Sequence, residues 1–373
     1  MNSTRIKGSP DGAGCYHVMS RTVGGETQSI MLFGEHEKNV FAKQLRKHAE
    51  FAGVEVLTWC MMDNHFHLLI RIPEREELLA GLMADGREKF WKCLRALYSR
   101  ERVKAVRDEV EKLERREKLD REAKRKPGAG KDGGTTTGVG TGGAADGGKA
   151  RRAEEILERY LRRMGDLSSF VKGLKFAFSV WFNRKHGRRG TLWMERFKSV
   201  LLEGEPWVLN KVAAYIDLNP IRAGLVEDPG DYRWSGYGQA AGGKVEARRG
   251  LSAVYGYGRN EWRQIASEYR QLLYLEGVEV RDAEGKVLRT GVSEEDFYRE
   301  TGKKGEEAVA KRFARRVAYF ANGAAIGSRE FLEAVFERNR GMFGPKRKTG
   351  ARKFRGAQWK GEGMYSLRDL GAG

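Results

Sequence analysis

Two apolar runs around residues 54–72 constrain this 373-residue chain more than any other feature. VEVLTWCM (54–61) and HFHLLIRI (65–72) are both rich in β-branched, aromatic and other apolar residues, and Asp63 and Asn64 stand between them. Runs of this length are typical of buried strands, and Asp-Asn is a common turn sequence. The stretch therefore predicts two strands joined by a tight turn.

A further strand and a helix are predicted before this pair. CYHVMSRTV (15–23) has the aromatic and β-branched content of a strand, and the segment 35–53 has apolar residues near helical spacing. Gly53 stands where a glycine commonly ends a helix. Strand, helix, strand, turn, strand is the first half of a ferredoxin-like layer. We therefore predict an α+β fold with a ferredoxin-like antiparallel sheet and packing helices.

The middle of the chain interrupts this order. Residues 102–126 carry 18 charges in 25 positions, which predicts a solvated helix without a core face, and residues 127–148 contain ten glycines in 22, which is typical of a flexible linker. An amphipathic helix is expected again at 167–187. We interpret about 102–150 as an insertion into one domain that spans 12–240, because the part before it would lack the rest of its sheet.

The C-terminal part, 250–340, is predicted to be helical. Segments 305–323 and 328–340 have the pattern of two helices joined by a short turn with glycine, and Ser328 stands at the expected N-cap of the second. The pair is either a DNA-binding helix-turn-helix or a helical hairpin without that role. Residues 341–373 follow as a basic tail with interleaved aromatic residues.

Two of the six histidines, His65 and His67, stand one residue apart on the predicted third strand. Alternate side chains on a strand point to the same face, so both should project together while Phe66 points the other way. Such a pair suits one divalent ion if another element adds a ligand, or it is simply part of a polar face. His17 and Arg21 share a face of the first strand, where they either meet the same ligand or lie exposed.

The charge of the chain indicates its class of partner. Lys and Arg exceed Asp and Glu by 70 to 51, which gives a net charge of +19 and a pI near 9.8. A surplus of this size favours a polyanion, nucleic acid before a membrane surface. No apolar run of about 18 residues predicts a membrane span, and the first ten residues lack a signal-peptide core. Three scattered cysteines favour a reducing compartment, so we expect a cytoplasmic protein.

Four blocks occur in a defined order: CYHVMSR, MMDNHFHLLIRI, FNRKHGRRGTLWMERFKS and AYIDLNPIRAGLVEDPGDYRWSGY. Together they resemble the IS200/IS605-type transposases with an HUH site (His, hydrophobic residue, His), in particular the group of REP-associated tyrosine transposases. The resemblance covers 12–240 without the insertion. It implies that His65-Phe66-His67 is the HUH triplet and holds Mg²⁺ or Mn²⁺. It also implies metal-dependent cleavage and rejoining of single-stranded or hairpin DNA by a tyrosine, in a homodimer.

The nucleophile is where the chain departs from that group. Phe197, in WMERF, stands where members that cleave DNA carry tyrosine. Tyr215 and Tyr160 are nearby alternatives, and both also have the helical spacing of packing residues. Glu195 and Glu203 are candidates for a third metal ligand or for simple charge balance. Two functions stay open: a strand-cleaving transposase, or a DNA-binding protein that retains the fold without the chemistry. A third, an RNA or general nucleic-acid chaperone, would need only the basic tail and would leave the histidine pair unexplained.

Basic residues gather around the block that contains Phe197, and glycines there allow a close backbone approach to phosphates. Trp193 offers a ring on which a base could stack. The basic tail should bind phosphates by counterion release. The residues predicted to contact DNA are Arg21, Arg188, Arg189, Trp193, Arg196, Lys198, Lys346, Arg347 and Lys348.

Overall fold

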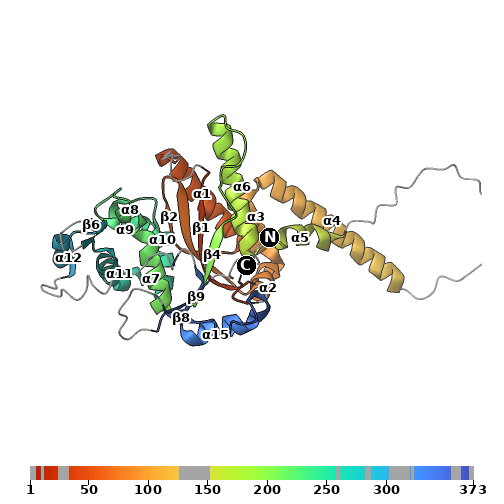
Figure 1. The fold of residues 1–373 in the computed structure, drawn as a ribbon. Coiled ribbons are helices and arrows are strands. Elements are labelled where there is room, and N and C mark those ends of the chain that lie inside the picture. Colours follow the sequence, from red (N-terminus) through yellow and green to blue (C-terminus); the bar gives the residue numbers. More distant parts are fainter. Residues whose placement is uncertain are drawn as a thin grey trace, which may run out of the picture.

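A seven-stranded sheet runs through the centre of the computed structural model (Figure 1). The structure describes residues 6–9, 12–23, 33–125, 152–257, 261–281, 287–301, 320, 323–353 and 363–368. The strands are β1 (Gly14–Arg21), β2 (Glu55–Met61), β3 (His65–Ile72), β4 (Lys198–Leu202), β7 (Gly323–Gly327), β8 (Arg352–Lys353) and β9 (Tyr365–Arg368). Their order across the sheet is β2-β3-β1-β4-β7-β9-β8. Strands β4 and β7 are parallel and the other neighbours are antiparallel, so the predicted α+β class is confirmed.

The predicted hairpin and helix are present at the start of the fold. Strands β2 and β3 pair directly, and helix α1 (Glu35–Ala52) crosses between β1 and β2. The helix begins after Gly34, whose backbone N–H donates to the carboxylate of Glu37. It ends at Gly53, which takes the left-handed conformation at φ 66°. The C-terminal end at Gly53 was predicted, whereas the contact between Gly34 and Glu37 was not.

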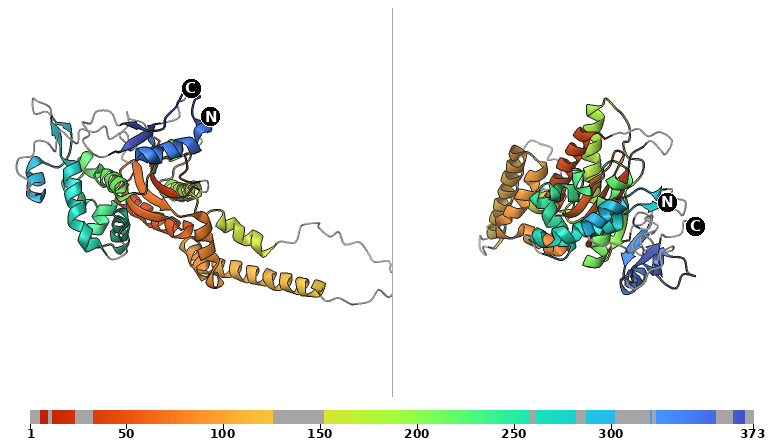
Figure 2. Two further views of the ribbon diagram at one scale, coloured as in Figure 1. Left: turned by 90° about the horizontal axis from the view of Figure 1, so that it is seen from below. Right: turned by 90° about the vertical axis from the view of Figure 1, so that its left-hand side faces the viewer.

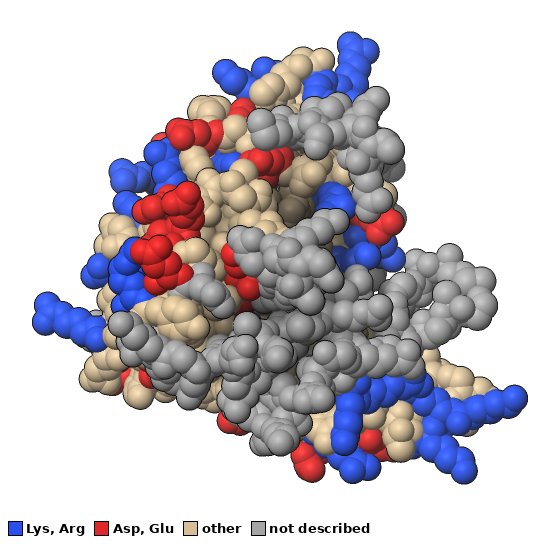
Figure 3. Space-filling view, turned by 60° about the vertical axis from the view of Figure 1, so that its left-hand side comes forward, with Lys and Arg blue, Asp and Glu red and all other residues tan. Residues whose placement is uncertain are grey.

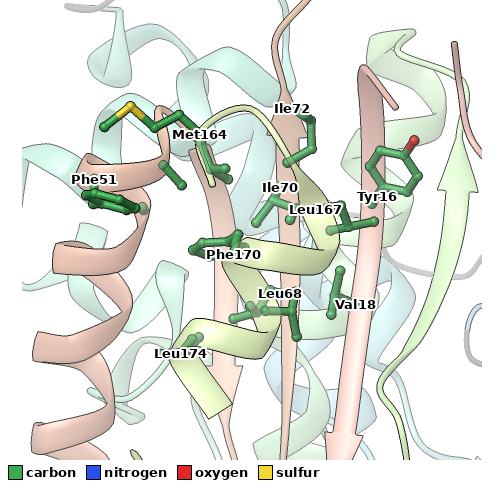
Figure 4. Close-up of a cluster of buried hydrophobic side chains, with 14 of the residues drawn as sticks. Tyr16, Val18, Phe51, Leu68, Ile70, Ile72, Met164, Leu167, Phe170 and Leu174 are labelled. Carbon is green, nitrogen blue, oxygen red and sulfur yellow. The ribbon is translucent and has the colours of Figure 1, made fainter. Parts of the chain in front are cut away.

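One face of the sheet is covered by α1 and by helix α6 (Leu167–Lys185). Figure 4 shows the contact: Leu68 and Ile70 of β3 point toward Phe170 and Leu174 of α6, with Val18 of β1 beside them. These five side chains are at most 2% exposed. We call this face, with the cluster that covers it, the apolar face.

The charged helix of the insertion is α4 (Arg100–Arg125), and residues 126–151 lie outside the described part. The prediction that this helix lacks a core face is wrong for its first half. Val103, Val106 and Val110 are buried, because they form an i, i+3, i+7 stripe among the charges. The second half extends away from the sheet (Figure 2), and Leu119 there is 65% exposed. Helices α3 (Glu88–Leu97) and α5 (Ala153–Leu161) contact α4, and α2 (Arg75–Met83) packs against α3.

The other face of the sheet is covered by helix α7 (Pro206–Asp217), which contacts β2 and β3. Further helices pack beside it: α8 (Asn219–Arg222), α9 (Gly236–Ala241), α10 (Val245–Val254), α11 (Trp262–Gly277) and α12 (Glu294–Thr301). A small hairpin of β5 (Val280–Arg281) and β6 (Val287–Arg289) precedes α12. In the described residues, 3₁₀ turns lie at Asp85–Arg87, Pro229–Asp231 and Arg340–Met342. We call this side of the sheet the histidine face, for the residues described below.

The helix-turn-helix prediction over 305–340 is wrong at its centre. Residues 323–327 form strand β7, which pairs with β4, whereas a turn was expected; residues 305–319 lie outside the described part. Ser328 does cap the following helix, α15 (Arg329–Arg338), since its hydroxyl accepts from the backbone N–H of Phe331. The helix buries Leu332, Val335 and Phe336 against the sheet, so its apolar side is used for packing.

The segment predicted as a basic tail contains folded structure. Strands β8 and β9 extend the same sheet that β1 and β3 begin. Between α15 and β8, the Arg347 guanidinium lies 4.6 Å from the ring centroid of Phe343 and donates to the backbone oxygen of Gly350. Residues 354–362, which hold the interleaved Phe354 and Trp359, lie outside the described part. Across the described ranges, no helix has both the length and the hydropathy of a membrane span.

Candidate functional site

The predicted common face of His65 and His67 is present, and β1 adds to it. Strands β1 and β3 pair with Arg21 opposite His65, Met19 opposite His67 and His17 opposite Leu69. Residues opposite each other in an antiparallel pair share a face, so His17, His65 and His67 all lie on the histidine face. Phe66 points the other way and packs against the Phe41 and Trp193 rings.

The three imidazoles are connected by short contacts. The Nε2 atom of His17 lies 2.9 Å from Nδ1 of His67, and Nδ1 of His17 lies 2.7 Å from the backbone oxygen of Phe320. The His65 and His67 ring centroids are 5.1 Å apart. His65 has its own partner, because its Nδ1 lies 2.7 Å from the side-chain oxygen of Asn64 in the turn.

Tyr215, on α7, closes the cluster from above the sheet. Its ring centroid lies 5.7 Å from that of His17 and 5.8 Å from that of His67, both in edge-to-face geometry. The Phe320 ring is 5.1 Å away, and the Arg222 guanidinium lies 5.1 Å from the Tyr215 ring centroid. Helical spacing correctly indicated a packing residue. The surface against which it packs, however, is the histidine cluster, which no local pattern indicates.

Phe197, the position of the expected nucleophile, lies elsewhere. It packs against the cluster on the apolar face, to which Phe66 belongs. Its neighbour Lys198 pairs with Met19 and so lies on the histidine face. Tyr160 is buried on α5, where its ring packs beside the rings of Phe90 and Tyr98. Of the three positions considered as nucleophile from the sequence, Phe197, Tyr160 and Tyr215, it is Tyr215 that contacts the histidines.

Burial keeps the imidazoles neutral. Desolvation lowers the pKa of His17 and of His65 to about 4, and the Arg21 charge adds to the effect at His65. The pKa of His67 is well below its usual value, first because of burial and then because of His17, His65 and Arg222. Near pH 7 all three rings are therefore uncharged, which is the form that binds metal ions.

His65 and His67 present two neutral imidazoles on one face of the sheet, but the described part of the protein supplies no complete metal site. There, no group of three or more His, Cys, Asp or Glu side chains is arranged to hold a metal. Glu203 accepts hydrogen bonds from Ser328, and Glu195 is an exposed loop residue, so neither carboxylate joins the histidines. An ion at this place would take its other ligands from a substrate or from water. Nitrogen donors suit Mn²⁺ better than Mg²⁺.

Part of the predicted DNA-binding set lies beside this cluster. The loop that precedes β4 is joined to the end of β1, because Met194 N–H donates to the backbone oxygen of Arg21. Arg21, Arg196 and Lys198 are exposed, and Arg21 and Lys198 both lie on the histidine face. Arg189 is also exposed, whereas Arg188 is half-buried with its guanidinium 5.6 Å from the ring centroid of Phe182. Of these cations, Arg21 and Lys198 share the face of the sheet that carries the histidines.

Trp193 does not serve as an exposed stacking ring. It is 7% exposed, packs against Phe33 and Phe66, and donates its indole N–H to the backbone oxygen of Lys175. Its flat ring fills the end of the apolar core, so that prediction is wrong.

The remaining predicted cations belong to the segment after α15. Lys346 and Lys348 are exposed, whereas Arg347 is engaged with Phe336, Phe343 and backbone carbonyls. Figure 3 shows one face of the molecule, on which Lys and Arg side chains are visible at several places, among them the top, the left edge and the lower right. The cations with a defined relation to the histidines are those at the ends of β1 and β4.

Comparison with known proteins gives little beyond these observations. No family model matches the chain, and no curated protein matches it. Among solved structures, the structure of a REP-associated tyrosine transposase bound to a REP hairpin is similar with a TM-score of 0.32 and 12% identity. The match covers 65% of this chain and 85% of that one. A likeness at this TM-score defines neither fold nor function.

Proposed function

We propose that the protein binds single-stranded or hairpin DNA on the histidine face and cleaves and rejoins it with a divalent ion held by His65 and His67. The observation that carries the proposal is the contact of Tyr215 with a cluster of neutral histidines. A nucleophilic hydroxyl, two metal-binding rings and nearby cations are the groups that phosphodiester transfer needs.

The surroundings of the cluster support an anionic substrate. Arg21 and Lys198 lie on the same face as the histidines and are exposed, and Arg222 approaches from α8. Positive charge around neutral imidazoles favours a phosphate and disfavours a free cation. A metal ion would therefore bind most strongly together with the phosphate, whose oxygens would complete its ligands. The ion, when bound, would polarise the phosphate and offset the charge that builds up on its oxygens.

The proposed chemistry assigns the nucleophile to Tyr215. Its hydroxyl oxygen would form a bond to phosphorus while the bond from phosphorus to the 3′-oxygen breaks, and the phenolic proton would pass to the leaving 3′-oxygen. A 5′-phosphotyrosine and a free 3′-hydroxyl result. Burial raises the pKa of Tyr215 and Arg222 opposes this shift, so the hydroxyl keeps its proton at neutral pH until the attack. Rejoining is the same reaction in reverse.

A second candidate is a protein that binds DNA without cleaving it. Phe197 favours this candidate, because it stands where the cleaving members of the resembled group carry tyrosine and because it packs on the apolar face. The raised pKa of the Tyr215 hydroxyl also favours it. Binding alone would still use the cations at the ends of β1 and β4.

The arrangement of the first strands supports the relation to the IS200-type group. If α2 to α5 between β3 and α6 are left out, the elements follow one another as β1, α1, β2, β3, α6, β4, and the strands lie in the order β4-β1-β3-β2. We infer a ferredoxin-like unit in these strands, extended by β7, β9 and β8. A role in DNA transposition, and the homodimer that the resemblance implies, are parts of the same proposal.

Covalent capture separates the two candidates. The full-length protein is incubated with Mn²⁺ and a pool of 3′-end-labelled single strands that contain a hairpin with randomised flanks. A labelled adduct that survives denaturing electrophoresis is expected with the wild type and with the buried-tyrosine control Tyr160→Phe, but not with Tyr215→Phe. A gel shift without any adduct would leave the binding protein as the function, and an adduct that persists in Tyr215→Phe would assign another hydroxyl.

A further inference from the structure

A chain of two hydrogen bonds leads to His67, one of the two proposed metal ligands. It starts at the backbone oxygen of Phe320, passes through both ring nitrogens of His17 and ends at Nδ1 of His67. His17 is fully buried and His67 is 5% exposed, so water does not compete for these contacts. In sequence, His17 is 303 positions from Phe320 and 50 positions from His67.

The chemistry of the first member fixes the direction of the whole chain. A carbonyl oxygen can only accept, so Nδ1 of His17 must carry the proton that it donates to Phe320. A neutral His17 is then bare at Nε2 and can only accept there. The hydrogen bond between the two rings therefore requires that Nδ1 of His67 carries a proton, which leaves Nε2 of His67 bare.

We infer that His17 is a positioning residue: together with the Phe320 carbonyl it holds His67 in the Nδ1–H tautomer and leaves the His67 Nε2 lone pair for a ligand. That the ligand is a divalent ion rests on the proposed function. The tautomer itself does not. A partner of this kind on the second nitrogen of a metal-binding histidine typically changes metal affinity 10- to 100-fold.

His65 obtains the same orientation by a local route. The side-chain oxygen of Asn64 can only accept, so Nδ1 of His65 carries the proton and its Nε2 is bare as well. The Nε2 lone pairs of His65 and His67 thus belong to one hairpin. The first is oriented by the adjacent Asn64, and the second by His17 and the backbone oxygen of Phe320. Phe320 therefore has a direct role at the site.

A competing role for His17 is that of a third metal ligand. This role would require its Nε2 to leave His67, and both of its nitrogens are already engaged. The two roles differ in what a substitution does. Glutamine can accept a hydrogen bond from His67 through its side-chain oxygen, whereas leucine cannot, and a glutamine amide is a poor substitute for an imidazole ligand.

The test measures the histidine tautomers and the Mn²⁺ affinity of the full-length protein. Protein labelled with ¹⁵N at its six histidines is examined without metal by two-bond ¹H–¹⁵N NMR, which distinguishes Nδ1–H from Nε2–H rings. Mn²⁺ affinity is measured separately by titration with electron paramagnetic resonance detection. The variants are His17→Leu, His17→Gln and, as a control on the same strand with its side chain on the apolar face, Ser20→Ala.

We expect His67 to be Nδ1–H in the wild type and in Ser20→Ala, and to shift toward Nε2–H in His17→Leu. Mn²⁺ affinity should fall about 10- to 100-fold in His17→Leu and recover to within about threefold in His17→Gln. A wild-type His67 protonated at Nε2 overturns the inference, even if every variant fails to fold. Equal loss of affinity in both His17 variants would make His17 a ligand and also overturns it. Absence of Mn²⁺ binding with the expected tautomer present would instead count against the proposed function.

Discussion

Strands β1 and β3 carry side chains of two kinds on their two faces. On the apolar face, Phe66 packs against aromatic rings and needs only volume and the exclusion of water. On the histidine face, His17 and His67 are buried to a similar degree but contact specific atoms at 2.7–2.9 Å. Two regions with the same degree of burial can therefore be different kinds of core. The apolar one tolerates repacking, whereas the polar one depends on each partner.

The largest expected loss of stability comes from a substitution on the apolar face. Phe66→Ala removes a fully buried ring from between α1 and the 188–198 loop and should lower the free energy of unfolding by about 3–5 kcal/mol. Urea denaturation followed by circular dichroism measures this loss. Phe176→Ala is the matched control, since Phe176 on α6 is 69% exposed, and it should change stability by less than about 0.5 kcal/mol. Equal losses would show that the apolar face is not the core of the fold.

The next prediction concerns a buried carboxyl on α7, the helix that covers the histidine face. Asp217, buried on α7, accepts hydrogen bonds from the Thr58 and Tyr269 hydroxyls and from the Tyr237 N–H, yet burial raises its pKa to about 7. An unfolded carboxyl releases its proton near pH 3.9, but the folded one holds it up to about 7. Between these values the folded state binds more protons, so this group's contribution to stability falls as the pH rises.

Asp217→Asn removes that titration. The wild type should therefore lose more stability than the variant between about pH 4 and pH 7, by about 2–4 kcal/mol, and the difference should be constant above pH 8. Urea denaturation of both proteins across this range measures the gap, and other titrating groups cancel in the comparison. Parallel curves for the two proteins would show that Asp217 is ionised throughout.

The smallest effect concerns the exposed border of the histidine face. Arg21→Gln should weaken binding of single-stranded DNA by about 1 kcal/mol and reduce the slope of log affinity against log salt by about 0.7, because one phosphate contact is lost. Fluorescence anisotropy at several salt concentrations measures both. Lys118→Gln, an exposed cation on the second half of α4, is the control and should change neither. If Lys118→Gln has the larger effect, the DNA lies on another surface.

Much of the fold could be predicted because its signals are local. The Asp63–Asn64 turn, the cap at Gly53 and the alternation through His65, Phe66 and His67 each depend on a few neighbouring residues. The charged helix was harder, since three valines among 18 charges in 25 residues are a weak stripe, yet they bury half of α4. The strand at 323–327 was missed because its pairing with β4 joins segments more than 100 residues apart.

The candidate site divides in the same way. The common face of His65 and His67 follows from strand geometry, and His17 and Arg21 were correctly assigned to one face of β1. Two features could not be predicted, because they depend on packing between helices and strands. Trp193 is buried, although a basic loop with glycines suggested exposure, and Tyr215 meets the histidines only because α7 lies across β3.

The sequence by itself determined which side chains share a face, where the turns fall and that the chain carries a large positive charge. These properties follow from backbone periodicity and composition, which act over a few residues or over the whole chain without regard to position. Only the tertiary structure decided which tyrosine contacts the histidines and which carbonyl orients His67. A hydrogen bond requires two atoms within about 3 Å, and for atoms that lie far apart along the chain this condition is met only by the packing of the entire fold.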